Sequence, residues 1–316
     1  MYPLLLKPVY KQIIWGGTRL KTDFGFESDA ENIAEGWMLT CREDAVNEVL
    51  NGEHKGKTLD EVVMCGKDDL LGTLYTGGEF PLLIKLIDAK YDLSVQVHPD
   101  DDYAKKNENS KGKTEAWLIL DCEKDARLIY GFNKEITRDE FKHSIYDNTL
   151  LKYVDTINVK KGDFFFIPAG TLHAIGGGIL LAEVQQSCNT TYRVYDYNRL
   201  ENGKSRPLHI DKAIDVTNTK PYKFKANITY QKIDDAIVSN LCECEWFKIK
   251  TASIDGKFNL DVSEKSFVSV IVLEGSAVIS SDGVNANIKK GDSVFIAAGS
   301  KDVFITGHLS VLISTL

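Results

Sequence analysis

Residues 162–173 read GDFFFIPAGTLH, and no other segment says as much about the fold. Four consecutive apolar residues bounded by turn residues are typical of a strand that is buried on both faces. Pro168 and Gly170 then predict a corner, because proline cannot donate to a strand ladder and glycine adopts backbone angles closed to other residues. His173 follows on the far side of that corner.

The same pattern occurs a second time. Residues 157–170 (INVKKGDFFFIPAG) and 286–299 (ANIKKGDSVFIAAG) are identical at nine of fourteen positions without gaps. Each copy predicts a strand, a Lys-Gly-Asp turn, a buried strand and a corner of small residues, so we expect two copies of one β-architecture. The copies differ at one telling position, because Asp302 stands in the second copy where His173 stands in the first.

Most of the remaining chain also has the pattern of strands. Apolar runs bounded by Gly, Asp and Asn cover residues 81–88, 93–98, 115–121, 179–187, 247–254, 267–275, 293–298 and 308–314. Helical patterns are few. They begin at Thr58 and Thr137, each followed three residues later by a glutamate in the spacing of a capping box, and predict helices over 58–72 and 137–147. The sequence therefore indicates an all-β protein with a few added helices.

The spacing G-x5-P-x-G-x2-H in residues 162–173 matches the second sequence motif of the cupins, which are small jelly-roll β-barrels that often hold a metal ion. With 316 residues, two domains are the first expectation. We predict two cupin-type jelly-roll barrels. Residues 1–230 would form a catalytic domain with helical insertions, and residues 231–316 a degenerate second domain without metal ligands.

A metal site is predicted from LSVQVH, residues 93–98. Side chains two apart on a strand project to the same side, so Gln96 and His98 face one cavity. Glu115, at the head of the next predicted strand, supplies a carboxylate, and His173 follows the cupin corner. Imidazole nitrogen and carboxylate oxygen suit Zn²⁺ at about 2.0–2.2 Å, whereas the amide oxygen of Gln96 adds a neutral donor. A lone strand histidine is more often structural, but here several candidate ligands converge.

Lysine and arginine also occur in unusual surroundings. Lys85 lies inside the apolar run PLLIKLID, where an unpaired charge would be costly to bury. Glu183, Arg193 and Arg199 lie in AEVQQSCNTTYRVYDYNR, and arginine offers a planar set of donors suited to phosphate. For most of these residues an ordinary surface charge is the simpler interpretation. Lys85 and Arg193 have apolar or aromatic neighbours, which makes that interpretation weaker for them.

The composition argues against several classes of partner. A net charge of −8 does not fit a nucleic-acid or anionic membrane surface. The N-terminus lacks the pattern of a signal peptide, and no run of about 18 apolar residues predicts a membrane span. The six cysteines form no C-x-x-C pair and are typical of reduced thiols. We therefore expect a cytoplasmic protein.

At the level of whole motifs, the sequence resembles the type I mannose-6-phosphate isomerases in their short bacterial form. The motifs, in order, are WGG, LIKLIDAKYDLSVQVHPDD, GKTEAW and IPAGTLHAIGGGILLAEVQQSCNTTYRVYDYNR, and the resemblance spans nearly the whole chain. It implies a zinc-dependent aldose–ketose isomerase that interconverts mannose 6-phosphate and fructose 6-phosphate through an enediol(ate).

The resemblance also implies roles for individual residues. The family's zinc ligands fall on Gln96, His98, Glu115 and His173. Its catalytic groups fall on Arg193, Lys113 and Glu183, and its substrate-binding groups on Ser94, Lys85 and Arg193. The general base stays open between Lys113, Glu183 and a zinc-bound water, and the oligomeric state between a monomer and a homodimer.

Two other functions fit part of the pattern. Two histidines and one carboxylate also form the facial triad of iron oxygenases, some of which are cupins. A non-catalytic sugar-binding cupin is the second alternative. The Gln96 amide and the lysine and arginine set favour zinc and a phosphorylated sugar over the oxygenase. A regulatory cupin normally carries a helix-turn-helix segment, and the sequence has no pattern of one.

Overall fold

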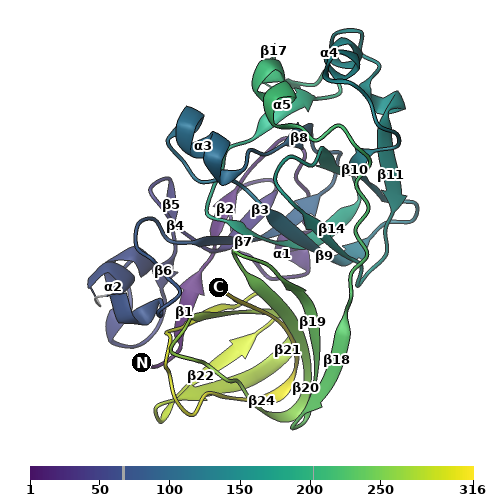
Figure 1. Ribbon diagram of the computed structural model, residues 1–316. Helices are drawn as coiled ribbons and strands as arrows, with labels where there is room; N and C mark the ends of the chain where they lie inside the picture. The colour runs from purple at the N-terminus through teal and green to yellow at the C-terminus, as the bar shows by residue number, and fades with distance from the viewer. Residues whose placement is uncertain (66–67, 202) are drawn as a thin grey trace.

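The computed structural model describes residues 1–65, 68–201 and 203–316, which fold mostly into β-strands with a few helices (Figure 1). This agrees with the prediction of a β-protein with added helices. The helix predicted over 58–72 is seen as α2 (Leu59–Cys65) and a 3₁₀ turn η2 (Asp68–Leu70), and residues 66 and 67 lie outside the described residues. Among the described residues no sheet closes on itself, so the two barrels stay a prediction.

Two sheets of the N-terminal half pack face to face and carry the site. The first, called the Glu115 sheet, runs in the order β12 (Phe164–Ile167), β9 (Glu115–Cys122), β14 (Ile179–Gln186), β7 (Leu82–Ala89), β3 (Glu35–Leu39) and β2 (Val9–Lys11). The second, called the His173 sheet, runs in the order β11 (Val154–Asn158), β10 (Arg127–Phe132), β13 (His173–Ile175), β8 (Val95–Val97) and β15 (Tyr192–Tyr195). Trp117, Phe165 and Tyr130 belong to the buried cluster between them.

Helices cover the outer face of the His173 sheet. Val95 and Val97 of β8 point outward into a cluster with Phe141 of α4 (Arg138–Tyr146) and Ala213 of α5 (Ile210–Val216). Because side chains alternate along a strand, Gln96 points the other way, toward the Glu115 sheet. The predicted capping box at Thr137 is present and starts α4.

Another helix, α3 (Asp101–Glu108), follows β8 directly. Its N-cap is Asp100, whose carboxylate accepts a hydrogen bond from the Tyr103 backbone at 2.8 Å. Asp101 and Asp102 occupy the first turn, where negative charge stabilises a helix. The run of three aspartates after Pro99 is therefore a helix start, which the sequence interpretation missed.

The C-terminal half forms a further sheet, called the C-terminal sheet, that packs under the Glu115 sheet (Figure 1). Its order is β18 (Thr229–Ile233), β19 (Ala236–Glu243), β20 (Lys248–Asn259), β24 (Phe304–Thr315), β21 (Val268–Ser281), β23 (Ser293–Ile296), β1 (Leu4–Lys7) and β6 (Glu48–Val49), and β22 (Val284–Lys289) pairs with β21. The remaining short elements are α1 (Arg19–Thr22), β4 (Cys41–Arg42), β5 (Ala45–Val46), η1 (Gly52–His54), η3 (Leu150–Lys152), β16 (Leu200–Glu201) and β17 (Lys204–Ser205).

The first strand of the chain lies within this C-terminal sheet. β1 pairs with β23, with Leu4 opposite Phe295. The amino group of Met1 forms an ion pair with Asp282 at 2.7 Å. Pairing thus crosses the predicted boundary at residue 230, and the division into domains stays a prediction.

The internal repeat adopts one local structure twice. In the first copy the Lys160 backbone donates to the Asp163 carboxylate at 2.9 Å, and in the second Lys289 donates to Asp292 at 2.8 Å. The glycine between them has a φ of 90° in both copies, a backbone angle that side chains with a Cβ rarely adopt. The similarity ends after the corner, where His173 begins β13 and Asp302 lies in a turn.

Candidate metal centre and active-site cavity

Two histidines and a glutamate converge between the two sheets of the N-terminal half. His98 follows β8, His173 begins β13 and Glu115 begins β9, and all three are buried. The Nε2 atom of His98 lies 3.4 Å from Glu115 Oε2, and that of His173 lies 3.3 Å from Oε1. One donor atom from each residue lies within 4.8 Å of the others. This spacing brings together three of the four predicted metal ligands.

Backbone carbonyls fix which nitrogen of each imidazole is available. His98 Nδ1 lies 2.9 Å from the Thr190 carbonyl, and His173 Nδ1 lies 2.8 Å from the Thr171 carbonyl. A carbonyl only accepts, so each Nδ1 carries the proton and donates it. Each Nε2 therefore presents a lone pair to the space beside Glu115. Such a second hydrogen bond orients histidine ligands in metal sites.

Electrostatics keeps these three groups in the protonation states of metal ligands. Burial and the Lys113 ammonium lower the pKa of His98 to about 3, and burial lowers the pKa of His173. Burial alone would raise the pKa of Glu115, but the ammonium group of Lys113 holds it well below its ordinary value. At neutral pH the cluster therefore holds one carboxylate and two neutral imidazoles, a donor set that fits a divalent cation.

Gln96 and Lys113 complete the surroundings of the cluster. The Gln96 side-chain nitrogen lies 3.5 Å from His173 Nε2, and turning the amide over brings its oxygen to the same place. The Lys113 ammonium lies 2.8 Å from Glu115 Oε2 and 3.2 Å from His98 Nε2. All four predicted metal ligands therefore lie together, with a lysine in direct contact.

A cavity of about 330 Å³ opens beside this cluster. The residues predicted for catalysis and substrate binding all line it, together with one predicted metal ligand: Lys85, Ser94, Gln96, Lys113, Glu183 and Arg193. They come from both sheets, so the cavity is formed between the faces of the sandwich. Its wall is rich in charged and amide side chains, which suits a small polar ligand.

Comparison with known proteins places this cavity in a family. Two family models match the chain, "Phosphomannose isomerase type I, catalytic domain" over residues 4–143 and "Mannose-6-phosphate isomerase, cupin domain" over residues 238–316. Mannose-6-phosphate isomerase ManA of Bacillus subtilis is 39% identical over 316 residues and aligns over 99% of each chain. The chain belongs to the type I mannose-6-phosphate isomerases.

Further relatives support this family membership. The mannose-6-phosphate isomerase of Streptococcus mutans is 36% identical over 319 residues, covering 99% of this chain and 98% of that one. The crystal structure of the mannose 6-phosphate isomerase from Bacillus subtilis superposes over the full length of both chains with a TM-score of 0.95 and 35% identity. Membership of the type I mannose-6-phosphate isomerases makes the chain an enzyme, and argues against both the oxygenase and the non-catalytic alternatives. In the described parts of the chain, no helix has the length and apolar character that crossing a membrane requires.

A buried ion pair lines the cavity of this type I isomerase. Lys85 of β7 lies 3.0 Å from Glu183 of β14 and 3.6 Å from Glu35 of β3. The other Glu183 oxygen accepts a hydrogen bond from Trp117 at 2.9 Å. Although burial favours the neutral form of Lys85, Glu183 and Glu35 raise its pKa, so it stays protonated. The predicted need of Lys85 for a partner is thus met inside the cavity.

Arg193 reaches the cavity from β15. Its Nε donates to the Ser94 hydroxyl at 3.2 Å, and its Nη1 donates to the Pro207 carbonyl at 3.0 Å. Burial and the neighbouring Arg206 lower its pKa, but an arginine remains charged at neutral pH. Ser94 and Arg193, each predicted to bind the substrate, are therefore in direct contact.

Several cavity residues were missed from the sequence. They are Trp15, Glu35, Asn189, Thr191 and Arg206. Glu35 lies on a strand at the N-terminal end, where the sequence interpretation placed no strand, and only its proximity to Lys85 identifies it. Arg199, noted in the sequence with Arg193, does not line the cavity and binds Asp196 instead.

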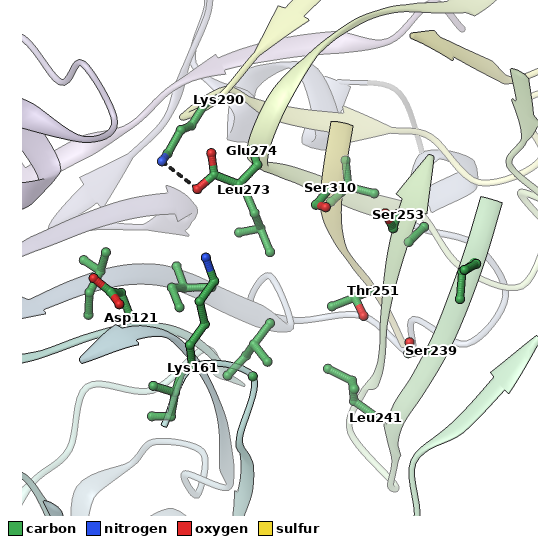
Figure 2. A pocket seen from close by; sticks show the side chains of 18 of the residues that line it. Asp121, Lys161, Ser239, Leu241, Thr251, Ser253, Leu273, Glu274, Lys290 and Ser310 are labelled. Carbon is green, nitrogen blue, oxygen red and sulfur yellow. Dashed lines mark hydrogen bonds and ion pairs between the residues drawn. The ribbon is translucent and has the colours of Figure 1, made fainter. Parts of the chain in front are cut away.

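A second cavity, of about 550 Å³, lies between the Glu115 sheet and the C-terminal sheet (Figure 2). It is lined by leucines of both halves and by hydroxyls such as Ser253 and Ser310. The Glu274 carboxylate and the Lys290 ammonium at its edge bind each other at 2.8 Å. No histidine is among the described residues that line it. The chemistry therefore points to the smaller cavity beside His98 and His173.

The buried ion pair gives a stability test. We expect Lys85→Met to lower the free energy of unfolding by about 3–5 kcal/mol, because it leaves the Glu183 carboxylate buried without its partner. Urea denaturation followed by circular dichroism measures the loss. Lys105→Met, on the exposed face of α3, is the control and should leave stability unchanged. A Lys85→Met protein as stable as the control would contradict the assigned pairing.

Proposed function

We propose that the chain interconverts D-mannose 6-phosphate and D-fructose 6-phosphate with one zinc ion, through an enediol(ate). The observation that supports this most is the donor set of Glu115, His98, His173 and Gln96 at the edge of a small cationic cavity. The family name carried by the relatives supplies the substrate class.

The proposed zinc site uses Gln96, His98, Glu115 and His173. Two neutral imidazoles, one carboxylate and one amide oxygen suit Zn²⁺, and a single anionic ligand leaves the site positively charged. A zinc ion held there would stabilise negative charge on a substrate oxygen as a Lewis acid. The Thr190 and Thr171 carbonyls orient the two imidazoles for this task.

The remaining cavity residues are assigned by their contacts. Isomerisation moves one proton between C1 and C2 of the sugar and another between the two oxygens, so it needs a base beside these carbons. Two cavity side chains have the chemistry of that base, Lys113 next to the metal ligands and Glu183 in the pair with Lys85. Arg193 acts electrostatically on the substrate, and Ser94 and Lys85 help to bind it.

We also infer a wider arrangement from the same observations. The repeated Lys-Gly-Asp turn supports two jelly-roll units, a catalytic one over 1–230 and a second over 231–316 that has Asp302 in place of the ligand His173.

The described cysteine thiols are free, in keeping with a cytoplasmic location. The sugar phosphate is the partner proposed here, and both a monomer and a homodimer remain compatible with it.

A coupled assay tests the function directly. We expect the purified enzyme to convert mannose 6-phosphate to fructose 6-phosphate, to lose this activity after chelation, and to regain it when zinc is returned. Oxygen uptake is measured in parallel, as the control for oxygenase chemistry. Full activity after complete removal of metal, measured by emission spectroscopy, would refute zinc dependence.

The ligand assignment is tested by zinc content. We expect His98→Ala and His173→Ala to lose zinc and activity together after gel filtration, because each removes one of four donors. His143→Ala, on the exposed face of α4, is the matched control and should keep both. A full complement of zinc in either site variant would show that the histidine is not a ligand.

Arg193 is tested by separating turnover from metal binding. We expect Arg193→Ala to retain zinc while kcat falls by about 10²–10³, the usual effect of losing one charge-stabilising group from a preorganised site. Zinc analysis and steady-state kinetics with mannose 6-phosphate are measured on the same preparation. A kcat close to that of the unmodified enzyme would remove Arg193 from the catalytic set.

A further inference from the structure

The charged residues of the cavity are distributed unevenly between its two ends. At the metal end each lysine has its own carboxylate, Lys113 with Glu115 at 2.8 Å and Lys85 with Glu183 at 3.0 Å. At the other end lies Arg193, whose pKa is lowered by burial and by the charge of Arg206. Among the described residues, Arg193 is therefore the cationic side chain of the cavity wall that has no carboxylate in ion-pair contact.

Arg206 lines the cavity and is held rigidly from behind. Its Nε donates to Asp196 Oδ2 at 2.8 Å and its Nη2 to Asp196 Oδ1 at 2.6 Å, a two-point contact that fixes the guanidinium plane. Asp196 is itself buried and does not line the cavity. It also binds Arg199 at 2.5 Å, so one carboxylate serves two guanidinium groups and the cluster keeps a net positive charge.

Each cavity arginine has a donor to spare. Arg206 Nη1 has no hydrogen-bond partner in the described part of the chain, and neither has Arg193 Nη2, because the bonds of these side chains go to Asp196, Ser94 and Pro207. Guanidinium donors arranged in a plane match the oxygens of a phosphate group. Two such groups at one end of a small cavity are therefore suited to a dianion.

The extended segment Ser94–Gln96, which enters β8, sets the distance from this end to the metal end. Ser94 contacts Arg193, and Gln96, two residues on, lies beside His173. Two strand residues span about 6.6 Å, a distance that a six-carbon chain can bridge. A sugar phosphate lying along β8 would have its reacting carbons near Gln96 and its phosphate at the arginines.

We propose that Arg206 binds the phosphate group of the substrate together with Arg193, and that Asp196 is the positioning residue that holds Arg206. This rests on the proposed function, since it takes a sugar phosphate as the ligand. It assigns Arg206 to substrate binding alone. Arg193, whose backbone lies opposite Gln96, borders both ends of the cavity and keeps the electrostatic role proposed above, whereas the metal ligands and the base act at the end away from Arg206.

The test compares Arg206→Ala with Lys204→Ala, which removes an exposed positive charge from the same segment and leaves the cavity wall intact. We expect Arg206→Ala to raise the KM for mannose 6-phosphate about tenfold to hundredfold, the range for losing hydrogen bonds to a charged group. Its kcat should change by less than about threefold, because uniform binding is lost and not transition-state stabilisation. Lys204→Ala should leave both constants unchanged. An Arg206→Ala enzyme with the KM of the control would overturn the proposal.

A binding measurement keeps this test independent of turnover. Inorganic phosphate is titrated calorimetrically into the zinc-loaded proteins, and we expect its affinity to fall in Arg206→Ala by a factor similar to the rise in KM. Arg206→Lys keeps the positive charge, and its phosphate affinity should lie between the affinities of the unmodified and Arg206→Ala proteins. If the unmodified enzyme failed to convert mannose 6-phosphate, the proposed function would fall. Phosphate affinity equal in the unmodified and Arg206→Ala proteins would overturn the role of Arg206 alone.

A double-variant cycle separates positioning from a merely structural role for Asp196. We expect Asp196→Asn to raise KM with little change in kcat, and the double variant Asp196→Asn/Arg206→Ala to have the KM of Arg206→Ala alone. When one residue acts only through another, the effects of their two substitutions are not additive. Additive increases in KM would overturn the assignment of Asp196 as a positioning residue.

Discussion

Glu115, His98 and His173 direct their electron pairs at one point in the buried interior, and the packing of the N-terminal half has to hold them there. Glu115 is fully buried with its oxygens facing the lone pairs of His98 and His173, an arrangement that repels itself unless a cation lies among the three. Lys113 supplies part of that positive charge from within the chain. The two sheets must therefore hold these groups at fixed positions, and the Thr190 and Thr171 carbonyls prevent the rings from turning away.

Each of the two packed sheets of the N-terminal half supplies part of the site. The His173 sheet supplies Gln96, His173 and Arg193, and the Glu115 sheet supplies Glu115, Lys85 and Glu183. Neither sheet carries a site alone, so the packing of Trp117 and Phe165 against Tyr130 and its neighbours also sets the width of the cavity. The helices α4 and α5 contribute from outside, because they cover the apolar face of β8 and so keep Gln96 turned inward.

Sequence reasoning found the cluster of His98, Glu115 and His173 because its signals are local. Spacing along a strand put Gln96 and His98 on one side, and a corner built from proline and glycine preceded His173. The same reasoning missed Glu35, since it reaches the cavity through the pairing of β3 with β7, two segments far apart in the chain. It missed Arg206 because this residue lies outside the strands and is placed by its contact with Asp196. It also missed α3, because three aspartates after a proline were not recognised as an N-cap and first turn. The strands before residue 50 are short and lack a clear alternating pattern, so only the sheet order reveals them.

The position of β1 has a consequence for folding. One edge of β1 pairs with β6, which lies close to it in the chain, and the other edge pairs with β23, which lies far from it. The first pairing closes a short loop and the second a very long one, and the entropic cost of closing a loop grows with its length. Completion of the C-terminal sheet is therefore a non-local step, of the kind that slows folding and leaves a strand edge open in the meantime.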